Sequence, residues 1–274
     1  MKPVYKTIAS PSVIYRGEVD AALEETSRIL DKVLVPIGKP VAVYFRADDI
    51  AIADPETSLL LDLFSNLQVP LALALIPAWL TPSRWKMLRK WDDANPHLWC
   101  WHTHGWRHLN HEMTGKKSEF GPSRSDDEIR SDLIRGMERL RALLKDRFCP
   151  VFTPPWNRCT ESTLDSLKAL GYRAVSRFVG ASPASAQGLI DLPAAVDLHT
   201  RKEASANAGW QALFHQIQDA FQTGRCGFMI HHQRMNASAF RYLAGLLALL
   251  SRHARIRLVS MQTLIDPAHS RPDG

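Results

Sequence analysis

The chain has 274 residues, and 45% of them are hydrophobic, so it can fill a core and is not a disordered protein. Its net charge of +6 includes no block of five or six basic residues, which argues against nucleic-acid binding but leaves room for a basic pocket that takes a phosphorylated or acidic substrate. No two cysteines form a CxxC pair and no apolar run approaches about 18 residues, which argues against a thiolate zinc site and a membrane span.

Predicted helices and strands alternate along most of the chain. A leading helix is expected over 18–34, where apolar residues recur on one side. Short apolar runs predict strands over 41–45, 69–76, 97–101, 150–153, 172–176, part of 189–198, 226–230 and 255–260. The helices predicted between them are 55–67 capped by Asp54, 82–93, a long helix opened by the capping box of Ser125 and Glu128, 160–170, a helix capped by Asn207 and running to Phe221, and 237–252.

This alternation predicts an α/β fold. Strands that alternate with helices form βαβ units and pair in parallel. About seven or eight such units favour a barrel, which need not be complete, over the alternative of an open doubly wound sheet. No glycine-rich dinucleotide fingerprint or phosphate-binding loop motif occurs.

Four polar clusters each follow a predicted strand directly. They are the segments 46–49, 102–108, 154–158 and 231–232. In a barrel of parallel strands the carboxyl ends share one face, where active sites lie. We therefore expect the four clusters to meet in one functional site.

The first and third clusters suggest a proton acceptor, a metal ligand and a substrate contact. Asp48 and Asp49 are adjacent carboxylates that repel each other, and their side chains point in different directions on a strand. One can therefore bind a metal while the other accepts a proton. Pro155 follows a second proline and fixes an extended backbone, which can aim the N–H of Trp156 at a substrate or its oxyanion.

Histidines supply further candidates. His104 and His108 are four residues apart, a spacing that brings two imidazoles together on a helical turn and suits zinc. His231 follows an apolar strand and fits either a core position or a catalytic one. Three rivals lie nearby: His102, His111 and His232.

The order of these motifs resembles the NodB-like polysaccharide deacetylase family. An Asp-Asp pair, HxxxH, Pro-Pro-Trp and a strand-ending histidine follow one another over about 41–260. The resemblance implies a distorted (β/α)7-type barrel of mainly parallel strands. We expect a single domain over 1–274, with the barrel over about 41–260 and an N-terminal helical extension over about 1–40.

The resemblance also implies roles for residues at matching positions. Asp48 corresponds to the catalytic base. Asp49, His104 and His108 correspond to the metal ligands. His231 corresponds to the general acid, which protonates the leaving amine.

The sequence departs from the family pattern in several places. Thr153 occupies the position of the arginine that orients the base in the family, and Arg46 or Arg158 could take over that role. The DxxDW motif is missing, so Asp197, or less well Asp191, is the candidate to support His231.

Together these features predict metal-dependent hydrolysis of an N-acyl group, N-acetyl above all, from an amino sugar or glycan precursor. The alternatives are deformylation or another carbon–nitrogen hydrolysis on the same scaffold, and non-catalytic carbohydrate binding. The expected cofactor is a divalent metal, with Zn²⁺ favoured over Co²⁺, Ni²⁺ and Fe²⁺. The expected partner is an N-acylated sugar or glycan, with no nucleic acid. Because the first twenty residues hold no continuous apolar segment, we expect a cytoplasmic protein.

Overall fold

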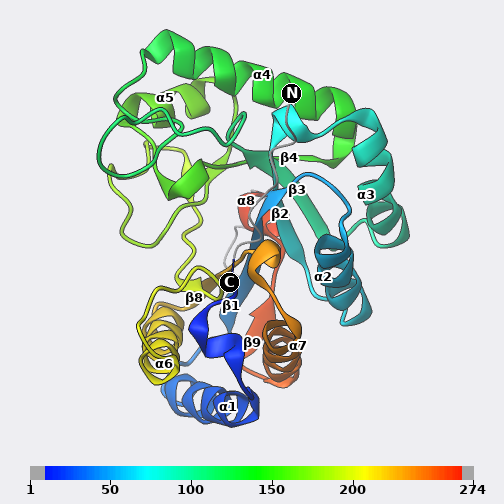
Figure 1. The fold of residues 1–274 in the computed structure, drawn as a ribbon, viewed down its shortest axis with the longest axis vertical. Coiled ribbons are helices and arrows are strands. Elements are labelled where there is room, and N and C mark those ends of the chain that lie inside the picture. Colours follow the sequence, from blue (N-terminus) through cyan, green and yellow to red (C-terminus); the bar gives the residue numbers. More distant parts are fainter. Residues whose placement is uncertain (1–9, 267–274) are drawn as a thin grey trace.

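The computed structural model describes residues 10–266 as a curled parallel sheet with helices around it (Figure 1). Along the sheet the strands are β6 (Ile190–Asp191), β5 (Ala174–Val175), β4 (Phe148–Thr153), β3 (Trp99–His104), β2 (Leu71–Leu75), β1 (Val41–Ile50), β8 (Arg225–Ile230) and β7 (Val196–Asp197). A ninth strand, β9 (Ile256–Leu258), pairs in parallel with the start of β1. All neighbouring pairs in this order are parallel too.

The predicted distorted (β/α)7-type barrel is confirmed. β6 and β7 are consecutive in the chain but lie at opposite ends of the strand order, so the barrel is incompletely closed. The single strand expected within 189–198 is therefore two short ones, separated by a segment that contains Pro193. Proline has no N–H to donate to a ladder, which is consistent with this interruption.

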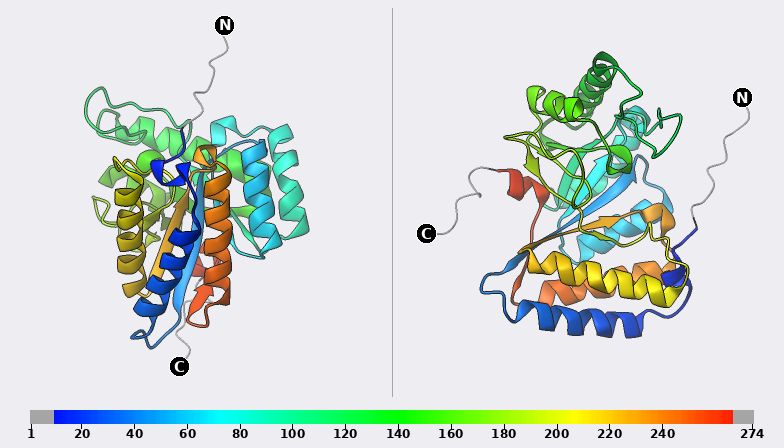
Figure 2. Two further views of the ribbon diagram at one scale, coloured as in Figure 1. Left: turned by 60° about the horizontal axis from the view of Figure 1, so that its bottom comes forward. Right: turned by 90° about the vertical axis from the view of Figure 1, so that its left-hand side faces the viewer.

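Helices cover the outside of the sheet. They are α1 (Asp20–Leu34), α2 (Pro55–Asn66), α3 (Pro82–Ala94), α4 (Asp126–Leu144), α5 (Glu161–Ala169), α6 (Ala206–Gln222), α7 (Ala237–Arg252) and α8 (Met261–Ile265). Short 3-10 helices are η1 (Val13–Arg16), η2 (Pro77–Trp79), η3 (Lys145–Arg147), η4 (Pro155–Asn157) and η5 (His232–Arg234). The leading helix α1 contacts both α6 and α7 and runs alongside them (Figure 2). Within residues 10–266 no helix is both long and apolar enough to cross a membrane.

Aromatic packing holds the central strand in place. Phe45 of β1 stacks on Phe228 of β8 at 5.1 Å between ring centroids, and Phe64 of α2 meets Phe45 edge-on at 5.4 Å. All three side chains are buried, and burial of each contributes about 1.5–3 kcal/mol of hydrophobic free energy. β1 is thus fixed between its neighbours, and so are the polar residues at its carboxyl end.

Three predicted helix caps can be compared with the structure. Asp54 is confirmed as the cap of α2, because its side chain accepts the N–H of Thr57. The capping box of Ser125 and Glu128 is confirmed at the start of α4. The predicted cap Asn207 is wrong, because the side chain of Ser205 accepts the N–H of Ala208 and α6 begins at Ala206. Ser205 has the extended backbone of a cap residue, whereas Asn207 already lies in the first helical turn.

The carboxyl ends of two strands also differ from the prediction. β1 continues to Ile50 and β3 to His104, so Asp48, Asp49 and His104 belong to the strands instead of following them. The prediction ended each strand where its apolar run ended. Asp48 and Asp49 lie in an irregular part of β1, between the pairs Ala47–Leu73 and Ile50–Leu75, whereas His104 pairs with Thr153. All three side chains line a cavity and not the apolar core.

Candidate active site

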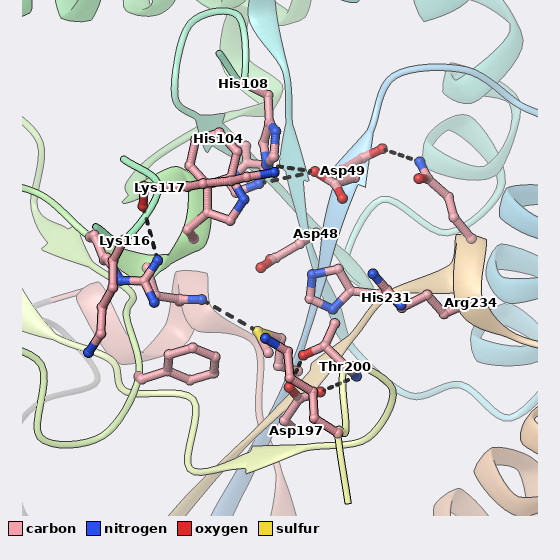
Figure 3. A pocket seen from close by; sticks show the side chains of 17 residues that line it. Asp48, Asp49, His104, His108, Lys116, Lys117, Asp197, Thr200, His231 and Arg234 are labelled. Atoms are coloured by element: carbon pink, nitrogen blue, oxygen red, sulfur yellow. Dashed lines mark hydrogen bonds and ion pairs between the residues drawn. The ribbon is translucent and has the colours of Figure 1, made fainter. Parts of the chain in front are cut away.

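The four polar clusters meet at one cavity of about 690 Å³ at the carboxyl ends of the strands. Figure 3 shows its central side chains. Its lining includes Asp48 and Asp49 from β1, His104 from β3, His108 and Trp156 from the connections that follow β3 and β4, and His231 after β8. The structure thus brings together residues that are far apart in the sequence.

Asp49, His104 and His108 form a group with the geometry of a metal site. One ligand atom from each lies within 4.8 Å of the other two. The Oδ1 atom of Asp49 is 3.4 Å from Nε2 of His104 and 3.2 Å from Nε2 of His108. Two imidazole nitrogens and one carboxylate oxygen suit a divalent transition metal, and zinc in particular.

The protonation of two of these side chains also suits a metal. Burial opposes ionisation of Asp49, but the neighbouring imidazoles of His104 and His108 hold the pKa of its carboxyl far below the usual range. Burial, together with neighbouring His104, lowers the pKa of His108 to about 4. An ionised carboxylate and a neutral imidazole are the forms that bind metals.

A backbone contact orients His104. Its Nδ1 lies 2.9 Å from the carbonyl oxygen of Thr153 on the neighbouring strand β4. This hydrogen bond fixes which ring nitrogen carries the proton and turns Nε2 toward Asp49, as is common for metal-binding histidines. His102, the rival candidate, is engaged elsewhere, because its Nε2 lies 2.9 Å from Oγ1 of Thr153 and its Nδ1 3.2 Å from the carbonyl of Cys100.

Glu119, which the sequence analysis missed, braces the turn that carries His108. Its fully buried carboxylate accepts the backbone N–H groups of Trp106 at 3.3 Å, Arg107 at 2.7 Å and His108 at 3.2 Å. His108 has a φ of 56°, which a non-glycine residue rarely adopts. Nothing in the sequence marks Glu119 beyond its place in the loop after HxxxH, because burial of an isolated acidic residue leaves no pattern.

Because Gly105 has no side chain, the carboxylate of Glu119 can lie close to the backbone of this turn. The φ of Gly105 is 62°, and a Cβ atom there would collide with the Glu119 carboxylate and with Pro155. Pro155 is buried against this turn and does not line the cavity. Trp156 does line it, and its ring centroid lies 4.5 Å from that of His108.

Asp48 is held by an arginine from its own strand. Nε and Nη2 of Arg46 donate to the two carboxylate oxygens of Asp48 at 2.8 and 2.9 Å, and both side chains are buried. Nη2 also donates to Oδ1 of Asn157, and Nη1 to Oγ of Ser176, each at 2.8 Å. Of the two arginines considered, Arg46 therefore contacts Asp48, whereas Arg158 donates to the carbonyl of Lys117.

This pairing keeps Asp48 ionised. Burial opposes its ionisation, but the charges of Arg46, His104 and His231 hold the pKa of the carboxyl below its ordinary value. Asp48 is thus an ionised carboxylate that lies beside the candidate metal ligands but is not one of them. Such a group can accept a proton from a water molecule in the cavity.

His231 and His232 have different surroundings. His231 lines the cavity, its backbone N–H donates to Nδ1 of His199 at 3.3 Å, and its own Nδ1 has no hydrogen-bond partner among residues 10–266. His232 is buried and does not line the cavity. Asp197 shares the cavity with His231, but its carboxylate accepts from the N–H groups of His199 and Thr200.

Comparisons with known proteins agree with this geometry. The family model described as polysaccharide deacetylase matches residues 37–175, a segment that contains Asp49, His104 and His108. A search of curated proteins returned no significant match.

Solved structures share the fold at low sequence identity. A candidate polysaccharide deacetylase from Mycobacterium smegmatis has 18% identity and a TM-score of 0.61, with 84% of this chain and 90% of that chain covered. A family 4 acetyl xylan esterase from Clostridium thermocellum, in complex with a cobalt ion, has 14% identity and a TM-score of 0.53, covering 84% and 96%. A CE4 family pseudoenzyme from Bacillus anthracis has 15% identity and a TM-score of 0.51, covering 84% and 66%. With the family model spanning half of the sequence, the chain belongs to the polysaccharide deacetylase family and is a hydrolase that removes acetyl groups from acetylated glycans.

Proposed function

We propose that this protein hydrolyses the N-acetyl group of an amino sugar, with Zn²⁺ held by Asp49, His104 and His108. The observation that carries the proposal is the convergence of these three ligands with the Asp48 carboxylate and the His231 imidazole on one cavity. When bound, a divalent metal polarises the amide carbonyl and lowers the pKa of water.

The side chains of the protein move two protons in this reaction. Asp48 accepts a proton from the water molecule whose oxygen bonds to the carbonyl carbon, while Arg46 holds the carboxylate in place. His231 donates a proton to the nitrogen as the carbon–nitrogen bond breaks, because an amine leaves poorly as an anion. The products are acetate and a free amino sugar.

Trp156 provides a surface for the sugar. Its side chain is partly exposed on the cavity wall beside His108, so one ring face can pack against the apolar face of a pyranose. Its φ of 55° and the neighbouring Asn157 at 60° show that the turn after β4 is held in an uncommon conformation. Such strain is often found where side chains are aimed at ligands.

Two other functions use the same scaffold. Hydrolysis of a different amide, such as an N-formyl group, would need the same base, metal ligands and acid. Non-catalytic carbohydrate binding would need none of them, so the buried Arg46–Asp48 pair beside the ligand triad favours an enzyme. Release of formate instead of acetate would distinguish hydrolysis of an N-formyl group from deacetylation. Sugar binding without any hydrolysis would identify non-catalytic carbohydrate binding.

The test combines metal analysis with an acyl-release screen. The purified protein is loaded with Zn²⁺, its metal content is measured, and acetate and formate release are followed over N-acylated sugars. We expect about one metal ion per chain and acetate release, with both lost in His104→Ala because a three-ligand site tolerates the loss of one ligand poorly. Lys86→Met, on the exposed side of α3, is the control. Bound metal with no acyl release from any sugar would contradict the proposal.

A further inference from the structure

Positively charged side chains surround the cavity beside the candidate metal ligands. They come from the connections that follow four different strands: Lys116 and Lys117 after β3, Arg158 after β4, Lys202 after β7 and Arg234 after β8. In Figure 3, Lys116 and Lys117 lie on one side of the cavity and Arg234 on the other, with Asp48 and His231 between them. The cations thus enclose the place where the acyl group would be cleaved.

The carboxylates of the cavity are already engaged. Asp48 pairs with Arg46, and Asp49 faces the two histidines of the triad. Asp197 accepts the side-chain hydroxyl and N–H of Thr200. Among the residues that line the cavity, Asp197 is thus a carboxylate without a cationic partner, and its single negative charge is smaller than the charge of the five cations.

The five cations, in turn, have no carboxylate partner. Among residues 10–266, none of them takes part in an ion pair, whereas several other arginines, such as Arg124 with Asp132 and Arg147 with Asp92, do. Lys116, Lys117 and Lys202 are exposed. A concave wall with unpaired charge of one sign concentrates ligands of the opposite sign.

We propose that the substrate is an amino sugar that carries an anionic group, a phosphate or a carboxylate, next to the N-acetyl unit. A neutral sugar would give the charges of these five side chains no counter-charge. A phosphate or carboxylate would instead receive charge-assisted hydrogen bonds from lysine and arginine. The cavity volume of about 690 Å³ lies within the range of small-ligand sites, so it can hold a sugar ring together with its charged substituent. This inference rests on the proposed deacetylation.

The test measures acetate release by the Zn²⁺-loaded protein from three probes: N-acetylglucosamine, its 1-phosphate and N-acetylmuramic acid. We expect kcat/KM to be at least about tenfold higher for one of the two anionic sugars, which identifies the anion as phosphate or carboxylate. Added NaCl should reduce this preference, because salt screens exposed charges.

Variants separate the cations from the metal. The double substitution Lys117→Met with Lys202→Met should lower the ratio of kcat/KM values, anionic over neutral, by about fivefold. Lys86→Met removes an exposed lysine of α3, which lies outside the cavity, and should leave the ratio unchanged. A preference that survives the double substitution and added salt would show that the metal selects the anion, and the inference would be wrong.

The remaining outcomes distinguish this inference from the proposed function. Equal kcat/KM values for all three sugars would overturn the anionic substrate while leaving deacetylation intact. If none of the sugars releases acetate, the proposed function fails for these substrates, and calorimetric titration of the same sugars into the metal-loaded protein decides the inference. Tighter binding of an anionic sugar, weakened by the double substitution, supports it, and equal binding of all three overturns it.

Discussion

Asp48 and Asp49 are neighbours in β1, yet their carboxylates have different partners. Asp48 is held by Arg46, and Asp49 faces His104 and His108. This division predicts that substitutions of the two residues have different consequences. Asp48→Asn should keep the metal and lose about 10²–10⁴ in kcat, since the water loses its proton acceptor. Asp49→Asn should lose the metal itself.

Metal content and acetate release, measured on the same preparations, check this prediction. Arg46→Lys gives an intermediate case, because a lysine cannot make the two-pronged contact with Asp48. We expect it to keep the metal and lose part of kcat. Metal loss in Asp48→Asn with retention in Asp49→Asn would show that the two roles are reversed.

The two consecutive histidines after β8 provide a second residue-level prediction. His231→Ala should reduce kcat by about 10²–10⁴ with little change in KM, because the proton transfer matters only in the transition state. His232→Gln changes the buried neighbour outside the cavity and should leave kcat nearly unchanged. Steady-state kinetics on both variants decide the matter. A larger loss of kcat in His232→Gln than in His231→Ala would transfer the role to His232.

Glu119 should control metal affinity without touching the metal. The carboxylate of Glu119 accepts hydrogen bonds from three backbone N–H groups of the turn that carries His108. In Glu119→Gln one of its two oxygens is replaced by an NH₂ group, which cannot accept these hydrogen bonds, so the turn should be held less firmly. Loss of such outer contacts weakens metal binding by about 10- to 100-fold. Glu112→Gln is the matched control, because Glu112 accepts from Ser123 within the same loop.

Competition with a chelator measures the metal affinity of each variant, and thermal unfolding of the metal-free proteins measures their stability. We expect Glu119→Gln to shift the affinity and Glu112→Gln to leave it unchanged. A lower unfolding temperature of metal-free Glu119→Gln with unaltered metal affinity would reduce Glu119 to a purely structural role.

At the scale of single elements, the start of α6 is the most direct test. The Ser205 hydroxyl accepts the N–H of Ala208, so Ser205→Ala should lower the free energy of unfolding by about 1 kcal/mol. Asn207→Ala should have little effect, because Asn207 lies inside the first turn and does not cap the helix. Urea unfolding of both variants compares the two positions directly. A larger loss in Asn207→Ala would mean that the helix starts later in solution.

Most elements could be predicted from apolar periodicity, while several of their ends could not. Hydrophobic runs located the starts of β1 and β3, but the polar residues that complete these strands face a cavity that only the folded sheet creates. The hydrogen bonds to Glu119 from the turn that carries His108 could not be predicted either, since they depend on positive φ values at Gly105 and His108. Arg46 was one of two candidates for the arginine that orients the base in the family, because Thr153 occupies the position of that arginine.

At the scale of the whole molecule, the candidate metal site joins segments that are far apart in the sequence and that the sheet brings together. Asp49 lies in β1, while His104 and His108 come from the end of β3 and the loop after it. A metal that binds all three is bound only by the folded chain. Zn²⁺ at a hundredfold excess over its Kd should therefore stabilise the protein by about 2.7 kcal/mol.

Calorimetric unfolding with Zn²⁺ and with a chelator checks this coupling. The unfolding temperature should rise with the metal in the wild type and stay constant in His108→Ala, which removes a partly exposed ligand. An equal rise in both proteins would show that the metal binds elsewhere.

The α/β barrel itself could be predicted from the alternation of apolar strands with helices. The sequence allowed an incomplete barrel but did not locate its opening, because β6 and β7 are only two residues long each and lack a periodic pattern. The chemistry of the ligands was also visible in the sequence, whereas the cations around the cavity were scattered over four loops. Only the fold shows that Lys117 and Arg234 flank the same cavity.

The contact between Arg46 and Asp48 has a consequence for how the site responds to motion. Both residues belong to β1, two positions apart, so the strand's own geometry sets their alignment. Thr153, where the family's orienting arginine would stand, belongs to β4, and β2 and β3 separate that strand from β1. An arginine there would transmit every shift between these strands to the carboxylate. Here the proposed base and the arginine that holds it lie on one strand, so their alignment depends less on the position of β4 than it would with an arginine at position 153.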